Sequence, residues 1–413
     1  MRILYIRENN SGCGYYRCFV PALFLNCSGH QVDFSYRLKK QHLKEYYIIF
    51  LQRAYSPFLI EILEEKRDAK LYYDIDDLLT GLYNEHHMFD FYKEKKKDME
   101  TIISLCDGII SPSQILLEKL SYLNKNQIYF PNLLINNFET NTVKKDKKSI
   151  IFAGTRSHKE DYKKYSSVFK KLREDHGIKM IFFGFKPDDF DESWMEYIEP
   201  VSIFDYQNRL SEIDASIGLA LLENNEFKRS KSVIKFAEYS SAGIISVLSE
   251  VGAFKDIPDE ICIKIDSKES LFNSIEQLMN KQDHEILNKT RGYIKENFHI
   301  SIAAKYLSKI TDFEKDFTFN KEIYNNLKKR FLMSDDLNDI IFSKSNYYIV
   351  GNSQTANEIV KIFKDRKITI NGVVESDDDI PKDSNVIICS KGYPGEIKSK
   401  LNEKGIKNIY SVY

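Results

Sequence analysis

Short apolar runs alternate with amphipathic stretches along the first part of the chain. Runs of this length are typical of buried strands in a parallel sheet, and the stretches between them have helical spacing. The predicted strands are residues 3–6, 31–34, 47–51, 70–74, 108–111 and 127–130. We therefore expect a Rossmann-like domain over residues 1–138, which ends near the polar segment 136–148.

The same alternation begins again after that polar segment. Its predicted strands are residues 149–153, 179–184, 215–222, 244–248 and 261–265, and a helical pattern covers 269–317. This indicates a second α/β domain over 147–318, and a shorter strand–turn–helix–strand pattern predicts a third over 335–413. The expected fold class is α/β, with two Rossmann-like domains facing a cleft plus a small C-terminal α/β domain.

Composition narrows the class of protein. The 413 residues are 42% hydrophobic, enough to fill several cores, and the net charge of -1 argues against a dedicated nucleic-acid binder. No apolar run approaches the roughly 18 residues that span a bilayer, and the N-terminus opens like a strand, so a cytoplasmic protein is expected. The six cysteines lack metal-ligand spacing, which argues against a disulfide framework and a zinc site.

The most informative stretch is residues 214–254, which read as strand, polar loop, helix, glycine turn and strand. Lys231 and Ser232 fall where the first helical turn is expected, and free backbone N–H groups at a helix start attract anions. Glu238 lies about two turns further along, a suitable distance for a carboxylate to hold ribose hydroxyls. The pattern predicts a nucleoside diphosphate site.

The pattern KSxxKxxEY, followed by AG and a second strand, resembles the donor-binding segment of bacterial glycosyltransferases of family 4, which have the type B fold. The resemblance implies a nucleoside diphosphate sugar as donor, with Glu238 on the ribose and Lys231 and Ser232 near the diphosphate. Lys235 is a further donor-binding candidate. Family members have two glutamates eight positions apart, and the earlier position is Ser230 here. The acid that contacts the sugar is therefore missing or supplied by Glu226.

A second loop, FAGTRSHKEDY, follows the first strand of the second domain. Arg156 and Lys159 could neutralise a diphosphate leaving group. Gly154, His158 and Asp161 match a Gly-x-x-x-His-x-x-Asp pattern of the resembled family, which implies a donor-side role. A structural role is an equal alternative, in which His158 and Asp161 cap the helix and fix its end. The catalytic candidates are Arg156, Lys231 and His158.

Two segments of the first domain are candidates for the acceptor side. In SGCGYYRC, Gly14, Tyr16 and Arg17 match a G-x-x-R arrangement that faces the cleft in the resembled family, although a flexible turn has the same composition.

The other acceptor-side segment is YDIDDLL, where Asp76 and Asp77 are expected to orient the acceptor. The spacing of Asp74 and Asp76 also fits the metal-binding DxD of type A glycosyltransferases. The two-domain pattern and the donor helix favour type B, which needs no metal.

Two weaker signals lie elsewhere. The turn GNSQTA and Glu375 form a loose dinucleotide-binding pattern in the third domain, which close packing alone could also explain. Oligomerisation or docking is the other role considered for this domain. The run KEKKKD, residues 93–98, is either a contact to an anionic membrane or a solvated helix face.

Together these patterns predict a transferase that moves a sugar to a glycan, a lipid-linked or a protein acceptor. The resemblance implies that configuration is retained and that no cofactor is required. The alternatives are a degenerate, glycosyltransferase-like binding subunit, suggested by Ser230, and a nucleotide-sugar epimerase, which the acidic and glycine-rich loops disfavour.

Overall fold

A computed structural model describes most of the chain in two compact units. The described residues are 1–65, 67–84, 86, 88–135, 146–155, 158–280, 284–310, 317–332, 347–351, 356–357, 360, 370–374, 380–381, 384–389, 394–406 and 408–411. The first unit comprises Met1–Asp74, Asp98–Gly108 and Phe317–Tyr413, and the second comprises Ile75–Lys97 and Ile109–Asp316.

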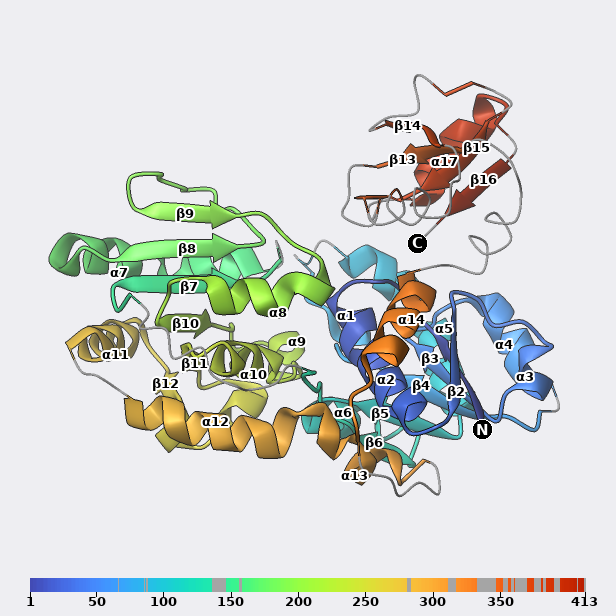
Figure 1. The fold of residues 1–413 in the computed structure, drawn as a ribbon, viewed down its shortest axis with the longest axis horizontal. Coiled ribbons are helices and arrows are strands. Elements are labelled where there is room, and N and C mark those ends of the chain that lie inside the picture. The colour runs from blue at the N-terminus through green and yellow to red at the C-terminus, as the bar shows by residue number, and fades with distance from the viewer. Residues whose placement is uncertain are drawn as a thin grey trace. The chain divides into compact units, whose positions relative to one another are not determined.

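The first sheet has six strands in the order β2-β1-β3-β4-β5-β6 (Figure 1). They are β1 (Arg2–Ile6), β2 (Gln31–Ser35), β3 (Ile48–Gln52), β4 (Lys70–Asp74), β5 (Gly108–Ser111) and β6 (Gln127–Tyr129), which confirms the six predicted strands. The helical segments between them are α1 (Gly12–Gly14), η1 (Tyr15–Phe19), α2 (Val20–Cys27), α3 (His42–Glu45), α4 (Pro57–Leu63), η2 (Leu79–Gly81), α5 (Phe89–Leu105) and α6 (Gln114–Leu120). Every residue of β3 is buried, as expected for a strand inside a covered parallel sheet.

The second sheet also has six strands, in the order β12-β11-β10-β7-β8-β9. They are β7 (Ser149–Ala153), β8 (Lys179–Phe183), β9 (Met195–Ile198), β10 (Ile217–Ala220), β11 (Ile245–Ser249) and β12 (Ile263–Ile265). The order reverses at β7, because β8 lies on one side of it and β10 on the other. Such a reversal is where open α/β sheets form their ligand crevice.

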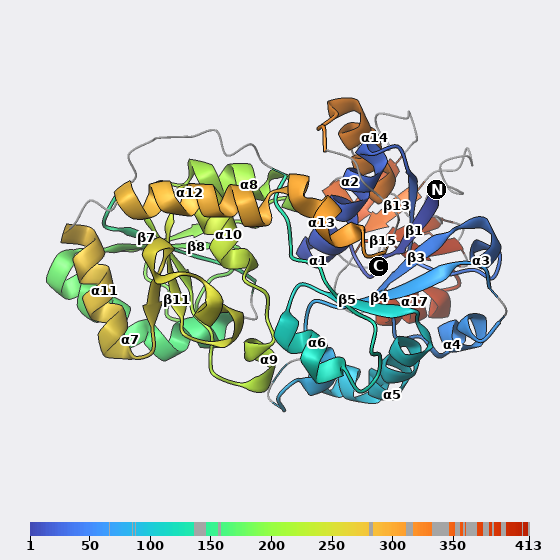
Figure 2. The same ribbon diagram turned by 90° about the horizontal axis from the view of Figure 1, so that it is seen from below.

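Helices cover both faces of this second sheet (Figure 2). One face carries α7 (Lys159–His176) and α11 (Lys268–Asn280), whose apolar side chains form a core with Trp194 and with alternate residues of the strands. The other face carries α8 (Ile203–Glu212), α10 (Ile234–Ser241) and α12 (His284–Phe298). The remaining helical segments of this region are α9 (Glu226–Arg229), η4 (Gly252–Asp256), η5 (Asp259–Ile261), η6 (Ile300–Ile302) and α13 (Ala303–Leu307).

The segment after residue 317 departs from the sequence prediction. The sequence assigned no element between the second and third predicted domains, but this segment forms α14 (Lys321–Leu332), which packs in the first unit. Phe331 lies edge-on against Phe19 and Phe34, and the Arg330 guanidinium donates to the Val32 carbonyl at 2.7 Å. The apolar residues Leu327 and Phe331 are spaced by one helical turn and face the core, while Lys321 and Lys329 are exposed.

The C-terminal residues form a third, four-stranded parallel sheet in the order β14-β13-β15-β16 (Figure 1). Its elements are β13 (Tyr347–Val350), β14 (Ile370–Val374), β15 (Asn385–Ile388), α17 (Pro394–Glu403) and β16 (Asn408–Ser411). The expected α/β fold class, with two larger sheets and one small one, is confirmed. Residues 352–355 of the GNSQTA turn and Glu375 lie outside the described residues, as do Arg156 and most of the segment 136–148.

No helix in the described part of the chain is both long enough and apolar enough to span a bilayer.

Candidate functional site

The Gly-x-x-x-His-x-x-Asp pattern has a geometric explanation at the end of β7. A Cβ atom on Gly154 would lie 2.8 Å from Cδ2 of His158, so the imidazole packs where any larger residue would place a side chain. His158 is the N-cap residue of α7, and its Nδ1 lies 2.9 Å from Oδ2 of Asp161 in the first turn. The glycine therefore makes room for the ring, and the aspartate fixes its orientation.

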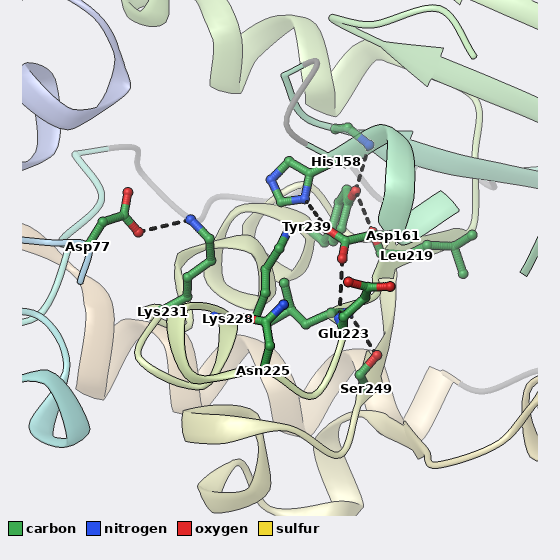
Figure 3. A network of polar contacts seen from close by, with 12 residues as sticks. Asp77, His158, Asp161, Leu219, Glu223, Asn225, Lys228, Lys231, Tyr239 and Ser249 are labelled. Carbon is green, nitrogen blue, oxygen red and sulfur yellow. Dashed lines mark hydrogen bonds and ion pairs between the residues drawn. The ribbon is translucent and has the colours of Figure 1, made fainter. Parts of the chain in front are cut away.

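Asp161 is the centre of a buried network (Figure 3). Its Oδ2 also accepts a hydrogen bond from Nζ of Lys228 at 2.6 Å, and its Oδ1 accepts the backbone N–H of Glu223 at 3.2 Å. Asp161 is 1% exposed and Lys228 3% exposed. The network joins α7, on one face of the sheet, to the segment that follows β10, and so spans the point where the strand order reverses.

The environment sets the protonation of this network. Burial lowers the pKa of His158 most strongly, and the charges of Lys228 and Lys231 lower it further against the opposing effect of Asp161. Burial by itself would raise the pKa of Asp161, but the hydrogen bond to His158 and the charge of Lys228 outweigh it and lower the pKa. At neutral pH an ionised Asp161 can only accept, so Nδ1 of the neutral His158 carries the proton.

Lys231 reaches the acidic segment that follows β4. Its Nζ lies 2.9 Å from Oδ1 of Asp77 and 4.5 Å from the centre of the Phe227 ring. The two charged side chains are 21% and 19% exposed, so this ion pair is accessible to solvent, unlike that of Lys228.

The helix in this stretch begins later than predicted. Lys231 and Ser232 precede its N-cap residue, Val233, and α10 starts at Ile234. Oγ of Ser232 accepts a hydrogen bond from Nδ2 of Asn132 at 3.1 Å, so this hydroxyl serves another segment and does not cap the helix. The expectation that both residues belong to the first helical turn is therefore wrong.

Glu238 is buried on α10, and its carboxylate is held from two sides. Oε2 accepts from Nζ of Lys235 at 2.7 Å and from the hydroxyl of Tyr206 at 3.3 Å. The Tyr206 ring stacks on Phe183 with ring centres 5.1 Å apart. Burial raises the pKa of Tyr206 well above its ordinary value, so its hydroxyl remains a donor. Tyr206 is a site residue that the sequence did not indicate.

Tyr239 anchors the same helix to the edge of the sheet. Its hydroxyl accepts the N–H of Ala153 at 2.8 Å and donates to the carbonyl of Leu219 at 3.1 Å, which ties α10 to the ends of β7 and β10. The ring lies over Gly218, where a Cβ atom would approach it to 2.6 Å.

Two predicted donor-side residues, Glu226 and Lys159, lie outside this network. Glu226 is 63% exposed and pairs with Lys119, 33% exposed, at 2.6 Å, while Lys159 pairs with Asp188 at the surface. Ser230 is fully buried, and its hydroxyl donates to the carbonyl of Glu226 at 3.0 Å. The position of the family's first glutamate is therefore filled by a small hydroxyl residue packed against the end of α9.

The predicted acceptor-side residues have mostly structural surroundings. A Cβ atom on Gly14 would lie 1.9 Å from the Asn9 carbonyl oxygen, so this close approach requires glycine. Tyr16 and Arg17 are buried in η1, a π-helical turn.

Arg17 and the acidic motif are connected. Arg17 binds Asp74 through two hydrogen bonds, Nε to Oδ1 at 2.9 Å and Nη2 to Oδ2 at 2.8 Å. The acidic motif is thus divided: Asp74 holds Arg17, Asp77 holds Lys231 and Asp76 is half-buried. Among the described residues, no group of three or more acidic, histidine or cysteine side chains is placed to hold a metal ion.

Comparison with known proteins places the fold among glycosyltransferases. No protein family and no curated protein matches the chain, but solved structures do. An alpha-glucosyltransferase (AGT) in complex with UDP matches with a TM-score of 0.55 and 12% identity, over 75% of this chain and 99% of that chain. The same coverage, TM-score and identity hold for alpha-glucosyltransferase in complex with UDP-glucose and DNA containing an abasic site.

The structure of TarM matches with a TM-score of 0.50 and 15% identity, over 64% of this chain and 54% of TarM, so this chain spans about half the length of TarM. At such identities the matches show the fold alone. Together with the two parallel six-stranded sheets, they confirm the expected type B fold.

Proposed function

We propose that the protein is a glycosyltransferase that takes a sugar from a nucleoside diphosphate donor. The observation that carries this proposal is the position of the polar network, at the reversal of strand order in the second sheet. Ligands of open α/β sheets bind at this point, beyond the carboxyl ends of the strands. The fold is shared with an alpha-glucosyltransferase whose structure contains UDP, which supports a uridine nucleotide as the first donor to test.

The described side chains suit the parts of such a donor. Lys231 is a solvent-accessible cation that can exchange its carboxylate partner for a diphosphate, with Ser232 beside it. Glu238 is held in place by Lys235 and Tyr206, so it is preorganised to accept hydrogen bonds from ribose hydroxyls. Arg156 and Lys159 remain predicted diphosphate contacts, and Glu226 remains the predicted sugar contact.

The reaction we propose retains configuration by attack on the same face that the leaving group departs from. The bond between the anomeric carbon and the diphosphate oxygen breaks as the acceptor oxygen bonds to that carbon, and the acceptor proton passes to the departing phosphate oxygen. Lys231 and Arg156 are the residues proposed to act on the leaving group, by stabilising the charge that develops there. His158 is the third residue proposed to take part in the reaction. No step in this scheme needs a metal ion.

Binding and transfer can be tested in the same set of variants. A thermal-shift screen with UDP-, GDP-, CDP- and dTDP-sugars identifies the donor, since a ligand at 100 times its Kd stabilises the folded state by about 2.7 kcal/mol. Lys231→Met should lower transfer about 100-fold to 1000-fold, as expected when one group that stabilises the leaving group is lost. Glu238→Gln should mainly weaken nucleotide binding.

Lys163→Met and Glu174→Gln are matched controls, because both residues are exposed on α7. Wild-type binding and transfer in both Lys231→Met and Glu238→Gln would refute the assignment. If EDTA abolishes transfer and manganese restores it, the result would instead support metal binding by Asp74 and Asp76.

A second candidate is a nucleotide-binding subunit without transferase activity. The buried Ser230 favours it, because the position where the resembled family has its first glutamate carries a hydroxyl and no carboxylate. Donor binding by the purified chain, with neither transfer nor donor hydrolysis across a panel of glycan, lipid-linked and protein acceptors, would support this alternative.

The remaining expectations are proposals of the same kind. We propose a cytoplasmic protein in which α5 can contact anionic lipid, because its lysines Lys93, Lys96 and Lys97 are exposed near the exposed ring of Phe91. Sedimentation with vesicles containing phosphatidylserine tests this contact. Oligomerisation through residues 335–413 is tested by light scattering of the full chain.

A further inference from the structure

Lys228 is a buried cation that the proposed reaction does not use. It lies in the single turn of α9, where its backbone N–H donates to Oδ1 of Asn225 at 2.9 Å. Its side chain points inward to Asp161, with Nζ 2.6 Å from Oδ2, and the pair is almost completely removed from water. The Asn225 cap therefore helps to fix the turn from which Lys228 reaches the network.

A buried ion pair of this kind is a poor source of stability. Removing each ion from water costs several kcal/mol, and apolar residues of similar size often stabilise a fold equally well. What the pair does determine is the charge of its neighbours. Asp161 Oδ2 contacts both Lys228 Nζ and His158 Nδ1 within 3 Å, so the two nitrogens are less than about 6 Å apart, a range over which one charge shifts the titration of another.

We propose that Lys228 is a positioning residue of the donor site, which keeps Asp161 ionised and His158 neutral with its proton on Nδ1. The role of Lys228 in sugar transfer rests on the proposed function. The protonation of Asp161 and His158 that it maintains does not. With Nδ1–H directed to Asp161, Nε2 of His158 is a hydrogen-bond acceptor. It points away from Asp161, toward the side where Lys231 ends (Figure 3).

This state selects the ligand group that His158 can meet. Nε2 and a phosphate oxygen are both acceptors, so they repel, whereas a sugar or acceptor hydroxyl can donate to Nε2. The positive charge near the ring belongs to Lys228 on α9 and Lys231 before α10, and the negative charge to Asp161 on α7. On the adjoining strand, the Phe152 ring lies 6.4 Å from the imidazole, centre to centre. Lys231 is thus left to bind phosphate, and the imidazole to bind a hydroxyl.

The test is a titration of His158 by NMR in the full chain, with histidine labelled in the ring and the signal assigned by its loss in His158→Gln. In the wild type the ring nitrogens should report the Nδ1–H tautomer. Lys228→Met should raise the pKa of His158 by about one unit or more, because a like charge is removed beside a retained carboxylate. Lys228→Arg should restore the wild-type value, and Lys163→Met should leave it unchanged.

Several outcomes would overturn the proposal. A wild-type ring protonated on Nε2 would do so, as would an unchanged pKa of His158 in folded Lys228→Met. If that variant does not fold, Asp161→Asn serves instead: loss of the carboxylate should lower the pKa of His158, and a higher or equal value contradicts the proposal. The titration is done without substrate, so its result does not depend on sugar transfer. Failure of the proposed function would be seen separately, in the Lys231 and Glu238 variants.

Discussion

Replacing Tyr239 by Phe tests how the donor-side helix is held. The change removes one oxygen atom and keeps the ring over Gly218. The lost hydroxyl bridges two strands, since it accepts from the Ala153 N–H at 2.8 Å and donates to the Leu219 carbonyl at 3.1 Å. Tyr239 is completely buried and Ala153 is 2% exposed, so water cannot replace the missing acceptor.

The expected cost follows from the unpaired group. A buried donor left without a partner costs about 1–3 kcal/mol, while the Leu219 carbonyl loses one hydrogen bond of ordinary strength. We therefore expect the free energy of unfolding to fall by about 1–3 kcal/mol. In a domain of this size, each kcal/mol corresponds to about 2–4 °C in Tm.

The assay uses the fluorescence of Trp194 during urea unfolding. This is the only tryptophan of the sequence, and it lies in the core of the second sheet, so the signal reports the affected region. Tyr122→Phe is the control, because its side chain is 65% exposed and its replacement should change stability by less than about 0.5 kcal/mol. A Tyr239→Phe variant as stable as this control would refute the reasoning.

Two further predictions concern buried ionisable groups. Arg17→Met should destabilise the first unit by about 3–5 kcal/mol, because it leaves Asp74 buried without its partner. The loss is measured as faster hydrogen exchange in β1 and β4. Recovery of stability in the double variant Arg17→Met/Asp74→Leu would support this cause. Burial lowers the pKa of His158, so below its unfolded value of about 6.5 the unfolded chain binds a proton that the folded chain excludes, and stability is lost as pH falls. In His158→Gln this part of the stability–pH curve should flatten, and an unchanged curve would contradict the prediction.

The sequence was most informative where apolar runs are long and central. Central strands of the first sheet, such as β3, were predicted because they are compact apolar runs. β9 was missed because it is a short edge strand, MEYI, whose central residues are only half-buried. The helix α14 was missed because charged and amide residues separate its apolar positions, although Leu327 and Phe331 already show helical spacing.

The site was predictable where residues lie close together in the chain. His158 and Asp161 are three positions apart, and the structure joins them directly. Lys228 was not indicated, because a lysine in a polar loop is normally exposed, and its partner lies 67 residues away. Tyr206 was missed for the same reason: its contact with Glu238 comes from packing α8 against α10 and leaves no local signal.

The π-helical turn η1 limits how homologues of this chain can vary in length. A π-helical turn contains an extra residue compared with the surrounding α-helix, so deleting one residue from Tyr15–Phe19 would restore regular helix. The helical residues of α1 would then rotate by about 100° relative to α2, while β1 and the loop that follows it stay in the sheet. Gly14 could not keep its close approach to Asn9 while Arg17 kept its pair with Asp74. A homologue shorter by one residue here is expected to lack one of these two contacts, which makes this insertion a simple marker for sorting related sequences.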